Sequence, residues 1–331
     1  MSRPLHRRSF VGGLAAGAAL GAIPGARALA QSAGSYPTQT VRIVVPVAPG
    51  GVTDVAARAI AAQLQQAWSQ SVVVENRPGG AGVPGTDFVA RARPDGYTLL
   101  MGTVGTLTVN GALIRKLPYD TLRDFVPVTM VTAAPNVLLL HPSVPAASVG
   151  ELIDYARRNP GRLNFGSPGN GSSPHLGGEL LKRLANIDMV HVPYSGAGPA
   201  SVDLFGGQIQ MMFDNPVTAL PNIRAGRVKA LAVTGSKRSP LLPDLPTLIE
   251  AGVPGYEIYS WTGMVAPART PPAELKAISD GVRRVLRLPE VRERLAGTDL
   301  VGNSPEEFGE FLRMEIEKWS TVLKAAGIQP E

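Results

Sequence analysis

The chain of 331 residues contains no cysteine. This absence excludes disulfide bonds, thiolate metal sites and cysteine nucleophiles, so packing alone must stabilise the fold. Beyond the first thirty residues no apolar run approaches the ~18 residues of a membrane-spanning helix. Neither dinucleotide-binding glycines between a strand and a helix nor a P-loop is present, so the sequence does not support nucleotide binding.

Basic charge is also scarcer than the formal net charge of +6 suggests. Residues 1–30 contain four arginines and no acidic residue, so the remainder of the chain carries a net charge of only +2. No block of five or more like charges is present. A nucleic-acid partner is therefore not expected.

The first thirty residues have the pattern of an export signal. Arg7-Arg8-Ser9-Phe10 precedes a Gly/Ala-rich apolar run, Val11–Ile23, and Ala28-Leu29-Ala30 provides a signal-peptidase site. We predict that residues 1–30 are removed, that the mature protein begins near Gln31, and that it is periplasmic. The paired arginines favour the twin-arginine route, with an ordinary Sec signal as the alternative.

Apolar, β-branched runs alternate with helical patterns along most of the chain, which contains 44% hydrophobic residues. This alternation predicts an α/β architecture with largely parallel sheets. The end of the chain reads as two helices, and the apolar residues of the last one, Phe308 to Leu323, are expected to be core. The expected strands are 41–47, 72–75, 97–102, 125–131, 136–141, 163–167, 189–193, 209–214, 228–234 and 261–266, and the expected helices are 54–68, 86–93, 148–159, 174–185, 199–205, 220–225, 271–286 and 305–326.

Two places look like crossings between sheets. Thr132–Pro135 separates two adjacent strands, and residues 235–238 open a proline-rich return. These crossings predict a discontinuous first lobe of residues 31–133 and 236–331, and a second lobe of residues 134–235. A cleft between two lobes is a common place for a small ligand.

Four glycine-rich loops connect strands to helices, at residues 46–54, 78–86, 167–175 and 194–199. The first turn of a helix has N–H groups without partners and a partial positive charge. Glycine allows a ligand oxygen to approach such a backbone closely. The loops therefore predict a site for a carboxylate or phosphate that needs no arginine.

Other chemistry has weaker support. Ser172, Ser173 and His175 lie close together, but no G-x-S-x-G motif is present, and a proline follows Ser173. The three histidines beyond the signal match no metal-ligand spacing, and His141 and His191 read as ordinary sheet residues. Asp54 and Asp214 are the acidic residues expected to face the cleft, although Asp54 could equally cap helix amides. No metal or cofactor is expected.

The loops, in this order, resemble the extracytoplasmic solute receptors of the tripartite tricarboxylate transporter system, the Bug (TctC-like) family. The resemblance spans the chain beyond the signal. It is carried by Tyr36-Pro37, Val44–Pro46, Pro49–Asp54, Val74–Gly79, Pro94–Leu99, Leu117–Asp120, Gly166–Ser167, Gly169–Leu176, His191–Tyr194, Gly196, Leu231–Thr234, Leu242–Thr247, Glu250–Gly252 and Trp261.

The resemblance implies a type II periplasmic-binding-protein fold, with two lobes joined by two crossovers and closing on a ligand. It implies a carboxylate bound by backbone amides and waters, without an arginine clamp. It places ligand contacts at Gly50, Gly51, Thr53, Asp54, Thr103, Ser167, Gly171, Ser172, Ser173, His175, Tyr194 and Asp214.

Three departures from the family pattern bear on the ligand. Val47 stands where phenylalanine is frequent, Val83 where asparagine is frequent, and Ser195 where a lysine often follows the tyrosine. Without that lysine, a mono- or dicarboxylate, or an amidated derivative, is easier to accept than a trianion.

We therefore expect a monomeric, non-enzymatic receptor that gives a small carboxylate to membrane permease subunits. Two alternatives stay open. One is an exported hydrolase that uses Ser173, His175 and Asp214, and the other is a ligand-sensing adaptor for a signalling system.

Overall fold

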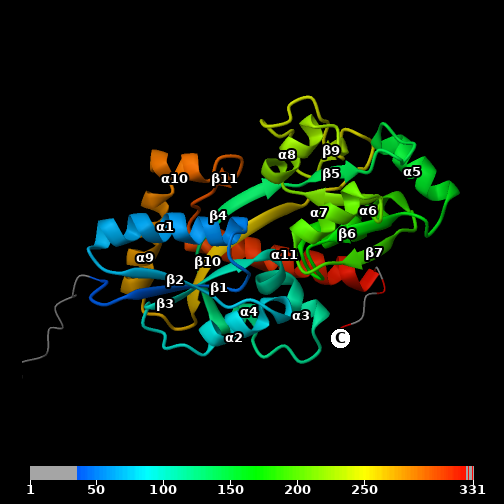
Figure 1. Cartoon of the computed structure of the whole chain (residues 1–331). Helices are drawn as coiled ribbons and strands as arrows, with labels where there is room; N and C mark the ends of the chain where they lie inside the picture. Colours follow the sequence, from blue (N-terminus) through cyan, green and yellow to red (C-terminus); the bar gives the residue numbers. More distant parts are fainter. Residues whose placement is uncertain (1–35, 326, 328–329, 331) are drawn as a thin grey trace, which may run out of the picture. The chain divides into compact units, whose positions relative to one another are not determined.

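Two β-sheets with helices on their faces make up the fold (Figure 1). The computed structural model describes residues 36–325, 327 and 330, so the predicted signal peptide lies outside the described residues. The two sheets confirm the predicted α/β class. Within the described part of the chain, no helix is both long and apolar enough to cross a membrane.

The first sheet has six strands in the order β11-β4-β10-β3-β1-β2. Strand β1 is parallel to β2 and β3, whereas β10 is antiparallel to β3 and β4, and β11 is antiparallel to β4. The strands are β1 (Val41–Val45), β2 (Val72–Asn76), β3 (Thr98–Thr103), β4 (Phe125–Pro135), β10 (Tyr259–Pro267) and β11 (Asp299–Leu300).

The second sheet has five strands in the order β7-β6-β8-β5-β9. Strand β6 is parallel to β7 and β8, and β5 is antiparallel to β8 and β9. The strands are β5 (Val137–Leu140), β6 (Asn164–Ser167), β7 (Val190–Pro193), β8 (Met211–Asp214) and β9 (Lys229–Val233).

The expectation of largely parallel sheets is wrong, because β4, β5, β9 and β10 all pair in antiparallel fashion. These are the strands through which the chain passes between the sheets. Two parallel neighbouring strands need a connection, usually a helix, that brings the chain back to the end of the sheet where the first strand began. No α-helix separates β4 from β5 or β9 from β10. Strands β5 and β10 are antiparallel although α5 and α9 follow them, so alternation with helices did not predict the direction of every strand.

The predicted break at Thr132–Pro135 is also wrong. Strand β4 continues to Pro135, where it pairs with Tyr259 of β10, and only Asn136 separates it from β5. Pairing along the full length of β10 gives these small residues partners for their backbone groups, which the local sequence does not reveal. The change of sheet nevertheless occurs at the predicted place.

The predicted helices are present, with ends shifted by a few residues. They are α1 (Val52–Trp68), α2 (Val83–Ala90), α5 (Val149–Arg158), α6 (Ser173–Ala185), α7 (Ala197–Phe205), α8 (Pro216–Arg224), α9 (Pro272–Val285) and α11 (Pro305–Ala325). The structure adds short segments that were not predicted: η1 (Gly80–Gly82), the π-helix η2 (Gly105–Val109), α3 (Asn110–Leu113), α4 (Thr121–Asp124) and α10 (Pro289–Arg294).

Alternate residues of the strands face different cores. In the first sheet Ile43 and Met101 join a core under α1, α9 and α10, whereas Val44 and Leu100 face the opposite way. That second core also contains residues of α6 and α11, and it extends to the second sheet. The last helix packs against β4 of the first sheet and against α6, and burial of its Trp319 confirms the predicted core face.

Helix α6 packs closely on β6 through Gly178. A Cβ at Gly178 would overlap the ring of Phe165, which is fully buried. We predict that Gly178→Ala lowers the free energy of unfolding by about 1–3 kcal/mol because the ring cannot move away. In Gly150→Ala, on the exposed side of α5 where no such overlap exists, stability should stay equal or rise by up to about 1 kcal/mol. Urea unfolding of both variants measures these changes. A Gly178→Ala variant as stable as the unsubstituted protein would contradict close packing of Gly178 on Phe165.

Candidate functional site

The predicted glycine loops follow strand ends that share an edge in each sheet. In the first sheet the parallel strands β1, β2 and β3 end at Val45, Asn76 and Thr103. In the second sheet the parallel strands β6, β7 and β8 end at Ser167, Pro193 and Asp214. Ligands of open α/β sheets bind beyond such carboxyl ends.

The crossing segments hold these two edges together. The Asn136 N–H donates to Thr234 Oγ1 (2.7 Å), and the Thr234 N–H donates to the Asn136 carbonyl (2.9 Å). Thr234 Oγ1 also donates to the Ile258 carbonyl at 2.7 Å. Asn136 Nδ2 lies 3.4 Å from Ser173 Oγ at the start of α6. Both crossings and the second-sheet loop therefore meet around Asn136.

Loops of the two sheets come into backbone contact near η2. A Cβ built on Gly105 would lie 3.2 Å from the Gly171 carbonyl oxygen. In the first sheet, Gly82 has a φ of +78°, and a Cβ there would lie 2.6 Å from Thr106 Cγ2 and 3.1 Å from the Pro46 oxygen. The structure thus brings together the loops that begin at Pro46, Pro78 and Ser167, with η2 between them.

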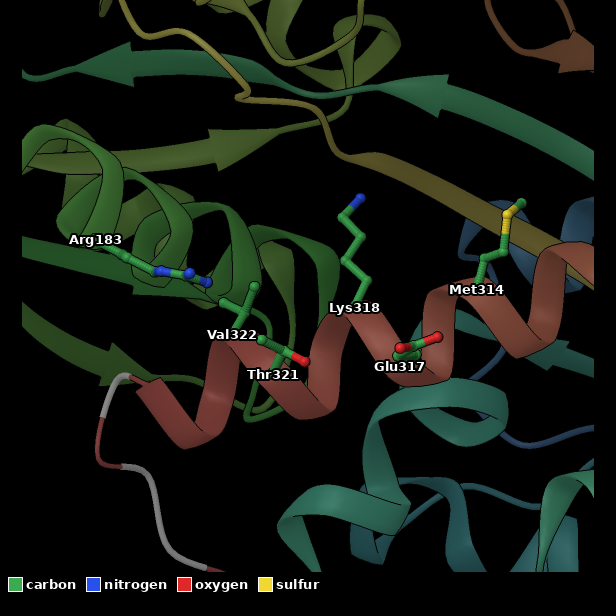
Figure 2. A pocket seen from close by; sticks show the side chains of 6 residues that line it. All are labelled: Arg183, Met314, Glu317, Lys318, Thr321 and Val322. Atoms are coloured by element: carbon green, nitrogen blue, oxygen red, sulfur yellow. The ribbon is translucent and has the colours of Figure 1, made fainter.

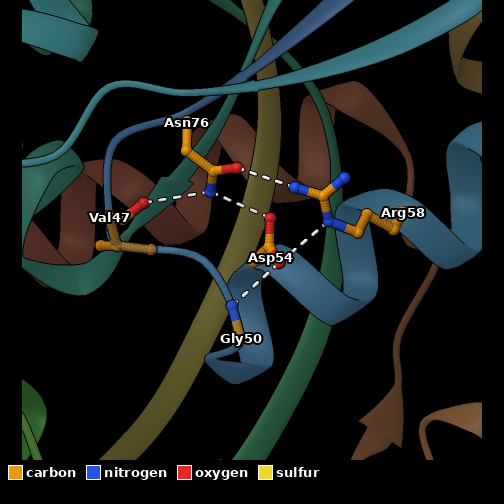
Figure 3. A network of polar contacts seen from close by, with 5 residues as sticks. All are labelled: Val47, Gly50, Asp54, Arg58 and Asn76. Atoms are coloured by element: carbon orange, nitrogen blue, oxygen red, sulfur yellow. Dashed lines mark hydrogen bonds and ion pairs between the residues drawn. The ribbon is translucent and has the colours of Figure 1, made fainter.

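In the first loop the Asp54 carboxylate is fully engaged by the protein (Figure 3). Asp54 Oδ2 accepts from the Gly50 N–H and from Arg58 Nε, each at 3.0 Å. Asp54 Oδ1 accepts from Asn76 Nδ2 at 2.9 Å. Burial alone would raise the pKa of Asp54, but these hydrogen bonds outweigh burial and lower the pKa. The geometry gives Asp54 the role of organising the loop, and its predicted contact with a ligand stays a prediction.

The backbone at the start of α1 keeps donors available. Within the described residues, the N–H groups of Gly51, Val52 and Thr53 have no protein acceptor, whereas the Gly50 N–H is used by Asp54. Gly51 is exposed, and no side chain caps this helix. Three adjacent N–H groups at a helix start provide partial positive charge and directional donors for a carboxylate.

The second loop is organised by a histidine from the neighbouring strand. Ser167 Oγ lies 2.7 Å from His191 Nε2, and it donates to the Gly169 carbonyl at 3.1 Å. His191 therefore donates from Nε2 to this hydroxyl. The ring of His191 stacks on that of His175, with centroids 4.0 Å apart. His175 Nδ1 accepts from the Gly171 N–H at 3.1 Å.

Both stacked histidines are held neutral. Burial, followed by the charges of His191 and Lys182, lowers the pKa of His175 to about 3. Burial, followed by the charge of Lys182, lowers the pKa of His191 to about 4. The pair therefore supports the loop as uncharged hydrogen-bonding rings rather than as a cationic clamp.

Ser172 and Ser173 have structural partners of their own. Ser172 Oγ caps α6 by accepting from the His175 N–H, and it donates to the Gly169 carbonyl at 2.7 Å. Ser173 is buried against Asn136. Among the described residues no hydrogen bond joins Ser173 to His175 or His175 to Asp214. The hydrolase arrangement of nucleophile, base and orienting acid is therefore not assembled.

The three remaining predicted contacts lie at the same edges. The Thr103 N–H donates to Thr106 Oγ1 at 2.9 Å. The Tyr194 hydroxyl donates to Asp203 Oδ2 at 2.7 Å. Asp214 is buried at the end of β8, where desolvation raises its pKa and its Oδ1 accepts from the Asn215 N–H at 2.8 Å.

Sequence reasoning missed the residues that hold the loops. Asn76 and Arg58 support the first loop, and His191 supports the second although it was read as an ordinary sheet residue. Asn136 and Thr234 connect the crossings. Asn76 and His191 stand in the stretches that carry the family resemblance, which is the one sequence signal that could have pointed to them.

Two surface hollows lie apart from these loops. One, of about 350 Å³, lies between α6 and α11, where Figure 2 shows Arg183 of α6 pointing toward Val322 of α11. The other, of about 280 Å³, is lined by Ala90, Pro94 and Arg123 among others. Neither hollow is lined by a residue predicted to contact the ligand.

Comparison with known proteins identifies relatives along almost the whole chain. The family profile described as "Tripartite tricarboxylate transporter family receptor" matches residues 56–328. Protein BugT of Bordetella pertussis is 37% identical over 299 residues, covering 89% of this chain and 92% of BugT.

Two solved structures of Rhodopseudomonas palustris proteins are similar in fold and sequence. Rpa4515 with adipate is 39% identical, with a TM-score of 0.82 over 89% of this chain and all of that one. MatC (Rpa3494) with bound malate is 38% identical, with a TM-score of 0.78 over 87% of this chain and all of that one.

Acid should destabilise the protein through the stacked histidines. Unfolded histidine has a pKa near 6.5, so below that pH the unfolded chain binds more protons than the folded one, whose values are about 3 and about 4. Stability present at pH 7 is therefore lost as the pH falls, by about 2 kcal/mol per histidine at pH 5.

Urea unfolding at pH 7 and pH 5 measures this loss. His191→Gln, which keeps a group able to bind Ser167 Oγ, should reduce the pH dependence by about half. Gly150→Ala, the variant on the exposed side of α5, serves as the control and should leave the pH dependence of stability unchanged. Equal stability of the unsubstituted protein at both pH values would contradict neutral buried histidines.

Proposed function

Because the chain belongs to the tripartite tricarboxylate transporter receptor family, we propose that it captures a small mono- or dicarboxylate outside the cytoplasm and gives it to a membrane permease. The family consists of solute-binding receptors and not of enzymes, so the hydrolase alternative is set aside. Two solved structures of similar fold are described as the periplasmic binding protein BugD and as a periplasmic transporter, which agrees with a periplasmic location.

One observation carries the proposal: the adjacent N–H groups of Gly51, Val52 and Thr53 have no acceptor among the described residues. Removing water from such N–H groups costs free energy, and a carboxylate that accepts hydrogen bonds from them offsets that cost. The two relatives cited above hold adipate and malate, both of which are dicarboxylates. A ligand of this class fits a site that takes one carboxylate at the start of α1.

A second carboxylate would be held from the other sheet. The N–H groups of Ala197 and Gly198, at the start of α7, also have no acceptor within the part of the chain that the structure describes. Ser195 stands beside them, so no lysine at this position adds a cation. This supports a mono- or dicarboxylate over a trianion.

Closure on the ligand would follow from the two crossings. We take residues 31–133 with 236–331 as one lobe and residues 134–235 as the other, moving about hinges at 132–136 and 234–238. A ligand bridging both lobes favours the closed arrangement because it binds that arrangement more tightly. The closed receptor, as a monomer, would then be the form that permease subunits select.

A carboxylate placed in the protein itself should compete with the ligand. Gly51 has ordinary extended backbone, with φ −78°, and a Cβ there would meet nothing within 4 Å. We predict that Gly51→Asp keeps or raises stability, since aspartate caps the first turn. It should weaken carboxylate binding by about 100-fold or more because it occupies the same N–H groups and repels the anion.

Isothermal titration with adipate, malate and a panel of monocarboxylates measures the effect. Gly51→Ala adds a Cβ without charge and is the control, which should bind within a few-fold of the unsubstituted protein. The corresponding Gly196→Asp tests the start of α7 in the same way. Unchanged affinity in Gly51→Asp would place the anion elsewhere, and binding of no carboxylate in the panel would refute the function.

A further inference from the structure

Three side chains form a frame that holds the first glycine loop, residues 46–54. We call Asp54, Arg58 and Asn76 the loop frame (Figure 3). Asn76, the last residue of β2, donates from Nδ2 to the Val47 carbonyl at 3.1 Å and to Asp54 Oδ1 at 2.9 Å. Its Oδ1 accepts from Arg58 Nη2 at 2.9 Å. One side chain thus restrains both ends of the loop, and Asp54 restrains its middle through Gly50.

The loop frame places the negative charge of Asp54 next to the proposed binding site for an anion. The Asp54 side chain is only 4% exposed and lies in the first turn of α1, beside the N–H groups proposed to receive a ligand carboxylate. Left alone, its negative charge would cancel the partial positive charge of the helix start and repel an anion. Some group must therefore balance it.

Arg58 is placed to do so from within the same helix. Its Nε lies 3.0 Å from Asp54 Oδ2, and its Nη2 is used by Asn76. Both contacts direct the guanidinium toward the frame, four residues beyond Asp54 on α1. The pair is close to neutral as a unit, so the partial charge of the helix start stays available.

Resting on the proposed function, we infer that Arg58 is a positioning residue that keeps the start of α1 receptive to anions by neutralising Asp54. Asn76 serves the same site by fixing the loop in shape. Arg58 does not hold the ligand in this scheme, and its effect depends wholly on the presence of the Asp54 charge.

The test is a set of charge variants titrated with adipate and malate by calorimetry. Arg58→Gln exposes the Asp54 charge and should weaken binding by about tenfold or more. Arg58→Lys keeps the positive charge and should retain most of the affinity. The double variant Arg58→Gln with Asp54→Asn removes both charges and should bind more tightly than Arg58→Gln alone.

Arg91→Gln is the matched control. Arg91 pairs with Asp87 four residues earlier on a helix, with Nε 2.9 Å from Oδ1, but it lies at the end of α2, away from the loop. Its loss should leave binding unchanged. Thermal unfolding of every variant separates a change in affinity from a change in folding, and the Arg58→Gln deficit should shrink as salt rises because salt screens the repulsion.

The outcomes separate this role from the proposed function. Recovery of affinity in the double variant supports charge balancing. If Arg58 had only a structural role, the loss of affinity caused by Asp54→Asn would add to the loss caused by Arg58→Gln. An unchanged affinity in Arg58→Gln, or a double variant weaker than Arg58→Gln, overturns the role while leaving the receptor function intact. A native protein that binds neither dicarboxylate overturns both.

Discussion

Hydrogen bonds around Asn136 hold the two sheets edge to edge, and the rest of the site depends on that junction. Asn136 and Thr234 exchange backbone and side-chain hydrogen bonds at the points where the chain leaves and re-enters the first sheet. Because β4 and β5 are separated by one residue, the ends of the two sets of parallel strands cannot move far apart. Glycine loops that are far apart in sequence therefore lie close together, as the approach of Gly105 to the Gly171 carbonyl shows.

In these loops the protein uses some backbone donors for its own hydrogen bonds and leaves others without a partner among the described residues. The Gly50 and Gly171 amides are used by Asp54 and His175. Those hydrogen bonds fix the loops, since a loop with several unsatisfied donors would be costly to order. Free donors include those at the starts of α1 and α7, where helix geometry itself leaves N–H groups without partners. Some N–H groups of these segments therefore hold the loops in shape, while other N–H groups of the same segments remain available to bind an anion.

Local sequence patterns were enough for the longer helices and for every strand except the two-residue β11, apart from their ends, and for the positions of the glycine loops. Pro174 after two serines placed the start of α6 to within one residue, because capping and proline at the first turn act over a few residues; the cap is Ser172 and the helix begins at Ser173. Long-range pairing could not be read in the same way. The continuation of β4 to Pro135 depends on β10, more than a hundred residues later, and the π-helix η2 depends on packing between the loops. Likewise, the partners of Asn76 and His191 become visible only once neighbouring strands are side by side.

The central claim is that backbone N–H groups at the start of α1 hold a ligand carboxylate. A crystal structure of the protein with adipate tests it most directly. The claim predicts a carboxylate oxygen within hydrogen-bonding distance of the Val52 and Thr53 N–H groups, with the Asp54–Arg58 pair intact beneath it. A carboxylate held instead by an arginine or lysine side chain, or lying in the hollow between α6 and α11, would contradict it.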